Sequence, residues 1–174
     1  MNTTLKFQSL SFGSISTYVA AAIFICGNIL LPQLFHLVPR GGVTWLPIYF
    51  FTLTAAYVYG WRVGLLTAVF SPLVNSVLFG MPLAGALPGI MLKSVLLAVV
   101  AGYAARCFNK ASLMSLALVV LAYQVAGTLG EWAIKGELYA ACQDFRIGIP
   151  GMLLQIFGGW AVINYLADRA ARER

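Results

Sequence analysis

Long apolar blocks, separated by short stretches that carry glycine, proline or single charges, make up most of this 174-residue chain. Of its residues 61% are hydrophobic and 9% are charged, with a mean hydropathy of +0.88. Soluble domains carry about 25% charged residues, so this chain has too few polar side chains to cover a soluble surface. Because the blocks approach the roughly 20 residues that a helix needs to cross a bilayer, the sequence predicts an all-α polytopic membrane protein.

Six blocks have the composition of a membrane span, which predicts a six-transmembrane-helix bundle. They cover residues 16–37, 43–59, 63–79, 87–105, 112–130 and 149–167. The predicted domain organisation is a cytoplasmic amphipathic segment at 1–15, a transmembrane domain at 16–169 and a cytoplasmic basic tail at 170–174. The second and third blocks are the shortest, so a tilted or partly re-entrant path remains open for them.

Basic residues divide unequally between the two sides of the predicted bundle. With the N-terminus inside, the inner segments hold seven Lys and Arg residues and the outer segments hold three. Since Lys and Arg concentrate in cytoplasmic loops, we expect a multi-pass protein of the bacterial inner membrane with both termini in the cytoplasm. The basic residues are scattered singly and form no stripe, which argues against nucleic-acid binding despite the net charge of +6.

Polar side chains within the blocks gather toward the predicted outer side. They include Asn28, Gln33 and His36 in the first block, Asn75 in the third, Lys93 in the fourth, Gln124, Thr128 and Glu131 along the fifth, and Gln155 in the sixth. The three in the fifth block are spaced i, i+4 and i+7, so they share one helix face. The inner halves of the fourth and fifth blocks are apolar, which favours a pocket that captures a solute from outside over a continuous channel.

Each of these polar residues also has a structural interpretation. Lys93 either lines a site or pairs with Glu131, because a charge at membrane depth needs a partner or water. Asn75 and Gln124 either line a site or hold neighbouring helices together by hydrogen bonds. Gly89, one turn before Lys93, leaves room for a long side chain or a ligand.

No catalytic or metal-binding motif stands out. The chain has no HExxH, no GxSxG and no nucleotide-binding glycine loop, and its three cysteines have no repeated spacing. We therefore expect no enzyme activity, no metal and no cofactor, and any active transport must draw energy from a partner or a gradient. The first block offers small-xxx-small pairs for such a partner, Ser16–Ala20 and Ala22–Cys26.

Several features together resemble the substrate-binding S components of energy-coupling factor (ECF) vitamin transporters. The chain length, the six spans and the small residues of the first span match that family. The turn at 59–64 (YGWRVG) resembles its G-x-x-x-G turn between spans 2 and 3, and residues 79–89 resemble its outer loop between spans 3 and 4. The family's A-x-x-x-A docking motif has only the two small-residue pairs as equivalents here.

The resemblance implies capture of a vitamin or related micronutrient outside, followed by delivery with a transmembrane coupling subunit and paired ATPases. It implies a ligand site built from the outer loops and the outer ends of spans 4 to 6. The candidates carried over by region are Asn75, Met81, Lys93, Gln124, Thr128, Glu131, Trp132 and Gln155, with Arg40 and Trp45 as a lid. Trp45 and Trp132 are either interface anchors or platforms for a flat ligand.

Two other classes of function remain open from the residues alone. A solitary or gradient-driven small-solute transporter would have a similar shape and would work without an ATPase partner. A non-transport membrane scaffold would use the polar residues only to hold helices together and would bind no ligand.

Overall fold

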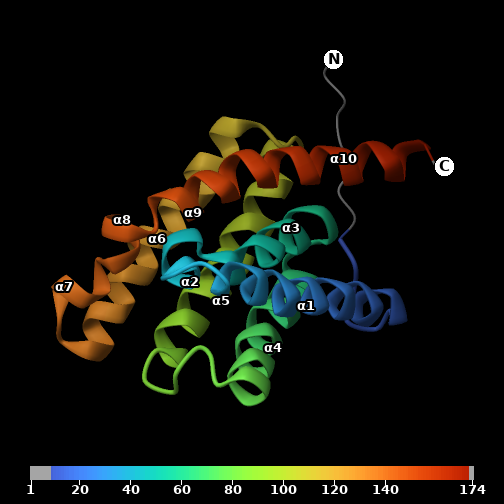
Figure 1. The fold of residues 1–174 in the computed structure, drawn as a ribbon. Helices are drawn as coiled ribbons and strands as arrows, with labels where there is room; N and C mark the ends of the chain where they lie inside the picture. The colour runs from blue at the N-terminus through green and yellow to red at the C-terminus, as the bar shows by residue number, and fades with distance from the viewer. Residues whose placement is uncertain (1–8, 173–174) are drawn as a thin grey trace.

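The computed structural model describes residues 9–172, which are helical for most of their length and contain no strand. In chain order the helices are α1 (Ile15–His36), α2 (Gly41–Trp45), η1 (Pro47–Tyr49), α3 (Phe50–Tyr59), α4 (Trp61–Phe79), α5 (Leu87–Phe108), α6 (Leu113–Lys135), α7 (Leu138–Ala141), α8 (Gln143–Ile147), α9 (Ile149–Leu153), η2 (Leu154–Gly158) and α10 (Gly159–Arg172) (Figure 1). The expected all-α class is confirmed. Residues 1–8 of the predicted cytoplasmic segment and 173–174 of the predicted tail lie outside the described residues.

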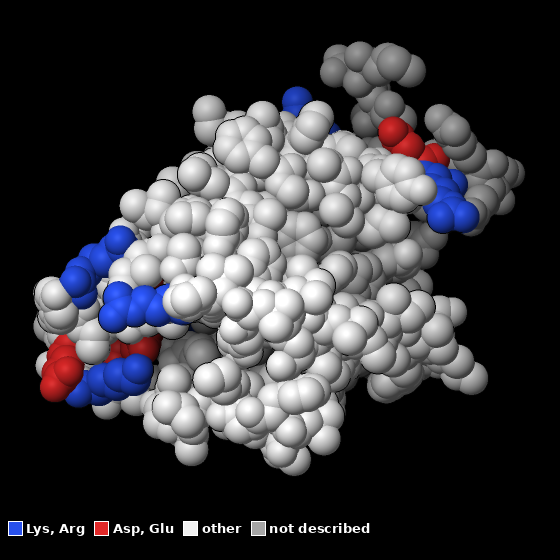
Figure 2. Space-filling model, in the orientation of Figure 1, with Lys and Arg blue, Asp and Glu red and all other residues white. Residues whose placement is uncertain are grey.

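Five helical stretches are long and apolar enough to cross a membrane. They are α1, α4, α5, α6 and the continuous stretch Ile149–Arg169, which joins α9, η2 and α10. Only 22% to 44% of each apolar window is buried, so many large apolar side chains face outward, as a lipid solvent allows. Figure 2 shows most of the charged side chains of the visible face at its two opposite ends, with a largely uncharged surface between them. This arrangement suggests a multi-pass membrane protein.

The expected second span, 43–59, does not form one continuous helix. Leu46 has a left-handed backbone (φ 47°) and Pro47 follows it, so the chain breaks into α2, η1 and α3. Proline has no N–H to donate and disfavours a helical residue before it, which explains the break. Helix α3 has 10 residues and is about 15 Å long, half the thickness of a hydrocarbon core. The expected count of six spanning helices is therefore not confirmed.

Helix α3 forms the centre of the molecule instead. It packs against α1, α4, α5 and α10, and Leu53, Ala56 and Tyr57 have no exposed surface. Small side chains on α5, among them Ala98 and Ala101, belong to the same buried core and allow close packing. Because α3 is enclosed by longer helices, its apolar residues are buried in protein.

The turn between α3 and α4 explains the glycines of the 59–64 segment. Gly60 has φ 95°, a conformation that other residues rarely adopt, and it reverses the chain in one residue. A Cβ atom on Gly64 would lie 2.4 Å from the Cβ of Ala56, so only glycine lets α3 and α4 approach so closely.

Contacts between distant segments define one end of the molecule. The Leu10 N–H donates to the Tyr59 carbonyl at 3.2 Å, and Arg62 Nη1 donates to the Leu10 carbonyl at 3.4 Å. Arg106 Nη2 donates to Ser9 Oγ at 3.0 Å. The first described residues, the α3–α4 turn and the last turn of α5 therefore meet at the same end.

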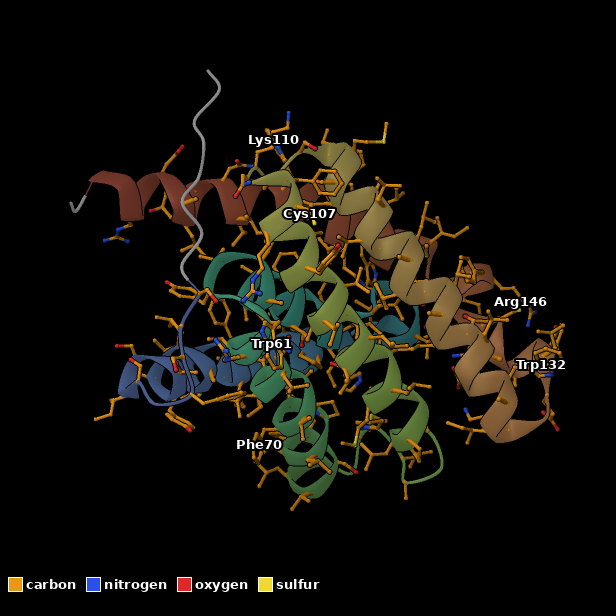
Figure 3. The ribbon with its side chains drawn as sticks, turned by 180° about the vertical axis from the view of Figure 1, so that it is seen from behind. Trp61, Phe70, Cys107, Lys110, Trp132 and Arg146 are labelled. Atoms are coloured by element: carbon orange, nitrogen blue, oxygen red, sulfur yellow. The ribbon has the colours of Figure 1, made fainter. Side chains whose placement is uncertain are left out.

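Figure 3 places Cys107 and Lys110 at one end of α6, and Trp132 and Arg146 at the other. We call these the Lys110 end and the Trp132 end. Arg106 lies in the last turn of α5, next to Cys107 at the Lys110 end, whereas the short helices α7 and α8 lie at the Trp132 end (Figures 1 and 3).

Candidate functional site

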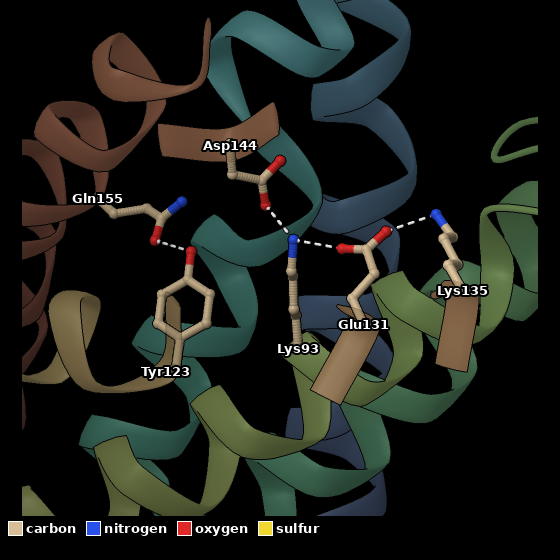
Figure 4. Close-up of polar contacts among 6 residues, drawn as sticks. All are labelled: Lys93, Tyr123, Glu131, Lys135, Asp144 and Gln155. Atoms are coloured by element: carbon tan, nitrogen blue, oxygen red, sulfur yellow. Dashed lines mark hydrogen bonds and ion pairs between the residues drawn. The ribbon is translucent and has the colours of Figure 1, made fainter. Parts of the chain in front are cut away.

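Four charged side chains form an ion cluster at the Trp132 end. Lys93 on α5 lies between two carboxylates, with its Nζ 2.7 Å from Glu131 Oε2 and 2.8 Å from Asp144 Oδ2 (Figure 4). Lys135 Nζ contacts Glu131 Oε1 at 2.5 Å, one turn further along α6. The cluster thus joins α5, α6 and α8 through charge-assisted hydrogen bonds.

Two glycines make room for this cluster. A Cβ atom on Gly127 would lie 2.4 Å from Lys93 Cγ, so the aliphatic part of Lys93 passes directly over that residue. A Cβ atom on Gly89 would lie 2.9 Å from Glu131 Oε1. The carboxylate of Glu131 therefore occupies the space that a side chain at position 89 would fill.

Three of the four side chains of the ion cluster are buried, Lys135 is exposed, and the cluster is balanced in charge. Lys93 is 3% exposed, and the side chains of Glu131 and Asp144 are each 11% exposed. Two cations face two carboxylates, so every charge in the cluster has an opposite partner. Such balance is what a buried cluster needs, because an unpaired charge away from water is costly.

A second polar contact lies beside the ion cluster, toward the middle of α6. The Tyr123 hydroxyl donates to Gln155 Oε1 at 2.8 Å, and both side chains have no exposed surface (Figure 4). Gln155 lies in η2, where the last span takes a π-helical turn, a feature that often marks functional sites. The ring of Tyr123 also contacts the ring of Tyr49, with centroids 5.6 Å apart.

Several buried polar atoms in this region have no hydrogen-bond partner among residues 9–172. They are Gln124 Nε2 and Oε1, Thr128 Oγ1, Gln155 Nε2 and Ser94 Oγ. Gln124 and Thr128 lie on α6 between Tyr123 and Glu131, on the face that carries Glu131. The region thus combines satisfied charges with unsatisfied neutral groups.

Asn75 belongs to a different network, between α1, α3 and α4. Its Nδ2 donates to the carbonyls of Asn28 at 2.9 Å and Ser71 at 3.0 Å. Asn28 Nδ2 donates to Thr52 Oγ1 at 3.0 Å, and Asn28 Oδ1 accepts the Phe51 N–H at 3.2 Å. Asn28 therefore satisfies an amide in the first turn of α3, which has no partner within that helix.

The remaining expected ligand residues lie nearer the surface. Arg40 is exposed, and Met81 and Trp132 are 48% and 44% exposed. Trp45 is partly buried, and its ring stacks on Phe35 with centroids 5.5 Å apart. The structure thus brings Lys93, Gln124, Thr128, Glu131 and Gln155 to one buried region. Arg40, Met81 and Trp132 are exposed, and Asn75 lies in a separate network. Trp45 ends α2, which packs against α8 and α9.

The two small-residue pairs of α1 face different directions. Ser16 and Ala20 line an apolar groove of about 560 Å³, whose other side is formed by Val162 and Leu166 of α10. Ala22 and Cys26 are exposed and do not line it. The pairs therefore do not form a single docking stripe.

Three buried residues of the region are not among the sequence-based candidates. Asp144 comes from a segment interpreted as an outer loop, and Tyr49 and Tyr123 are aromatic residues within apolar blocks. The signal for Asp144 was present, because a lysine at membrane depth calls for acidic partners and the chain has only five acidic residues. A tyrosine within an apolar block carries no comparable signal.

The chemistry available here is binding by hydrogen bonds, charge and aromatic contact. Within residues 9–172, no group of three His, Cys, Asp or Glu side chains is placed to hold a metal ion. No family model, curated protein or solved structure matches this chain.

Proposed function

We propose that this chain is the substrate-capture subunit of an ECF-type importer. In this proposal it binds a vitamin or related micronutrient at the Trp132 end, facing outside, and delivers it together with a coupling subunit and paired ATPases. Both termini lie in the cytoplasm, and α2, η1 and α3 together act as the second of six membrane passes. The resemblance of the 59–64 turn and the 79–89 loop supports this family assignment.

One observation carries the proposal: buried neutral polar groups with no partner among residues 9–172 lie between the middle of α6 and its Trp132 end. Leaving a buried donor or acceptor unpaired costs free energy, so such groups are rare unless they serve a purpose. Gln124, Thr128 and Gln155 come from two different spans and lie beside the ion cluster. This distribution favours a ligand site over a scaffold, in which polar groups would pair as Asn28 and Asn75 do.

Delivery would depend on protein partners. The chain carries no nucleotide-binding motif, so the energy for release comes from the ATPases. The groove lined by Ser16 and Ala20 is a natural place for a helix of the coupling subunit, since small residues allow close helix packing. Ala22 and Cys26 offer a second, separate contact on α1.

The experiment is purification in detergent followed by denaturation and mass spectrometry of the released small molecules. We expect one compound in a fixed ratio to protein, and we expect the same compound to raise the melting temperature of protein that has been stripped of it. An empty protein that no member of a vitamin panel stabilises would contradict the proposal and favour the scaffold. Uptake by liposomes that contain this chain alone would instead indicate a solitary transporter.

A further inference from the structure

The ion cluster has no unmet need for an ionic ligand. Lys93 is held by two carboxylates at 2.7 and 2.8 Å, and Glu131 has a second cation, Lys135, at 2.5 Å. An anionic ligand would have to displace a carboxylate from Lys93, and a cationic ligand would have to displace a lysine. Either exchange breaks a charge-assisted contact and replaces it with another of the same kind.

The buried side-chain groups that lack a hydrogen-bond partner within residues 9–172 are uncharged. Gln124 is completely buried, and both its carboxamide oxygen and its carboxamide nitrogen lack partners within residues 9–172. Gln155 is equally buried and uses its oxygen for Tyr123, but its nitrogen has no partner in the same range. Thr128, 6% exposed and one turn from Gln124 on α6, adds an unpaired hydroxyl.

A free carboxamide edge has a specific complement. It presents one acceptor and one donor side by side, and a cis-amide edge of another molecule presents the reverse order. The two can therefore form a pair of hydrogen bonds in one plane. Cyclic amides such as lactams, ureides and pyrimidinones hold their amide in this cis form.

We propose, building on the proposed function, that the ligand is a neutral molecule with a cis-amide edge, which Gln124 recognises. Thr128 and the free nitrogen of Gln155 bind further acceptors of the same ligand. The rings of Tyr49 and Tyr123, which lie against each other beside Gln155, provide apolar surface for a flat ring. The ion cluster does not bind the ligand but holds α8 against α5 and α6 at the end of the site.

The test uses the full-length protein in detergent, stripped of bound molecules, and measures its melting temperature with three sets of probes. Riboflavin, biotinamide and thymine are neutral with a cis-amide edge, and each is compared with its N-methylated analogue. Nicotinate and pantothenate are the anionic probes, and thiamine and choline are the cationic probes. We expect stabilisation by at least one neutral probe and a loss of that stabilisation on N-methylation.

Three substitutions separate recognition from structural support. Gln124→Leu removes the carboxamide at nearly constant size, so we expect binding at least about tenfold weaker with an unchanged or higher melting temperature of the empty protein. Asn75→Leu is the matched control, because Asn75 is a buried amide whose nitrogen donates to two carbonyls and whose oxygen accepts from Gln33 at 3.5 Å. It should lower the melting temperature of the empty protein and leave the choice among probes unchanged. Thr128→Val provides a smaller change on the same face, with a weaker loss of binding.

The outcomes separate the two proposals. Stabilisation only by anionic or cationic probes would keep the proposed function and overturn the neutral cis-amide ligand. Retention of the neutral probe's effect in Gln124→Leu, or a marked fall in the stability of the empty variant, would overturn the role of Gln124. If no probe stabilises the protein and no compound co-purifies with it, the proposed function itself fails.

Discussion

Replacing Lys93 by methionine removes the cation that Glu131 and Asp144 share. The two contacts are 2.7 and 2.8 Å long, and at an effective dielectric constant of about 20 each corresponds to about 6 kcal/mol of gross attraction. Desolvation offsets most of this attraction. Removing one partner of a buried pair therefore costs about 3–5 kcal/mol, because it leaves an uncompensated charge. Methionine keeps a flexible chain over Gly127, so the loss is mainly electrostatic.

Thermal unfolding in detergent, followed by tryptophan fluorescence, measures this cost. For a chain of this size 1 kcal/mol corresponds to about 2–4 °C, so we expect the Tm of Lys93→Met to fall by roughly 6–20 °C. The double variant Lys93→Met/Asp144→Asn should recover part of the loss, since it removes one of the two carboxylates left without their cation.

Lys135→Met is the matched control for this prediction. Lys135 contacts the same carboxylate, Glu131, but its side chain is 31% exposed. Exposed ion pairs contribute at most about 1 kcal/mol, so the Tm should fall by less than about 4 °C. If the Tm of Lys93→Met falls no further than the Tm of this control, the ion cluster does not hold the helices together and the reasoning is wrong.

Three further predictions follow from the packing and the topology. Asn28→Ala should cost about 1–3 kcal/mol, measured by the same unfolding assay, because it leaves an amide of α3 and two buried hydroxyls without their partner. Gly127→Ala should lower the Tm by displacing the lysine of the ion cluster, whereas Gly130→Ala, which meets only the tip of a leucine, should have less effect; equal falls would contradict this. In sealed vesicles, single-cysteine proteins with Cys107 or Cys142 should react with an impermeant maleimide from opposite sides of the membrane; labelling from the same side would contradict the topology.

The long spans could be predicted because the length of an apolar block is a direct measure of its ability to cross a bilayer. The expected spans 87–105 and 112–130 correspond to α5 and α6, which run on to Phe108 and Lys135. The fifth block was expected to end at residue 130 because charged residues follow. In the structure the helix continues, and the pair Glu131–Lys135 is spaced i, i+4 on its surface.

The prediction of one continuous helix for the second span was wrong, because composition alone does not show whether a helix is interrupted. Its apolar content is sufficient for a span, but Pro47 lies near its start and breaks the hydrogen-bond ladder there. The sequence also cannot show which apolar segment will be enclosed by the others. The burial of α3 depends on small residues of α5, such as Ala98 and Ala101, which are about 40 residues away along the chain.

The row of Gln124, Thr128 and Glu131 could be predicted from helical spacing alone, but the partner of Lys93 on α8 could not. Asp144 lies 51 residues from Lys93, in a short helix that carries no apolar periodicity to place it. Only the folding of α8 onto the Trp132 end brings the second carboxylate to the lysine. Local spacing therefore defined one face of the site, and tertiary packing completed it.

Asn75 and Gln124 could not be distinguished from the sequence, but the structure shows that they differ in their hydrogen-bond partners. Both are amides within apolar spans, and both were open to either a structural or a ligand-binding interpretation. The nitrogen of Asn75 donates to the carbonyl of Asn28 on α1 at 2.9 Å and to the carbonyl of Ser71, one turn back on α4, at 3.0 Å. Gln124 faces a buried region in which no described residue pairs with either end of its carboxamide. The role of a buried amide therefore follows from what the fold places opposite it, and among residues 9–172 the fold places no partner opposite Gln124.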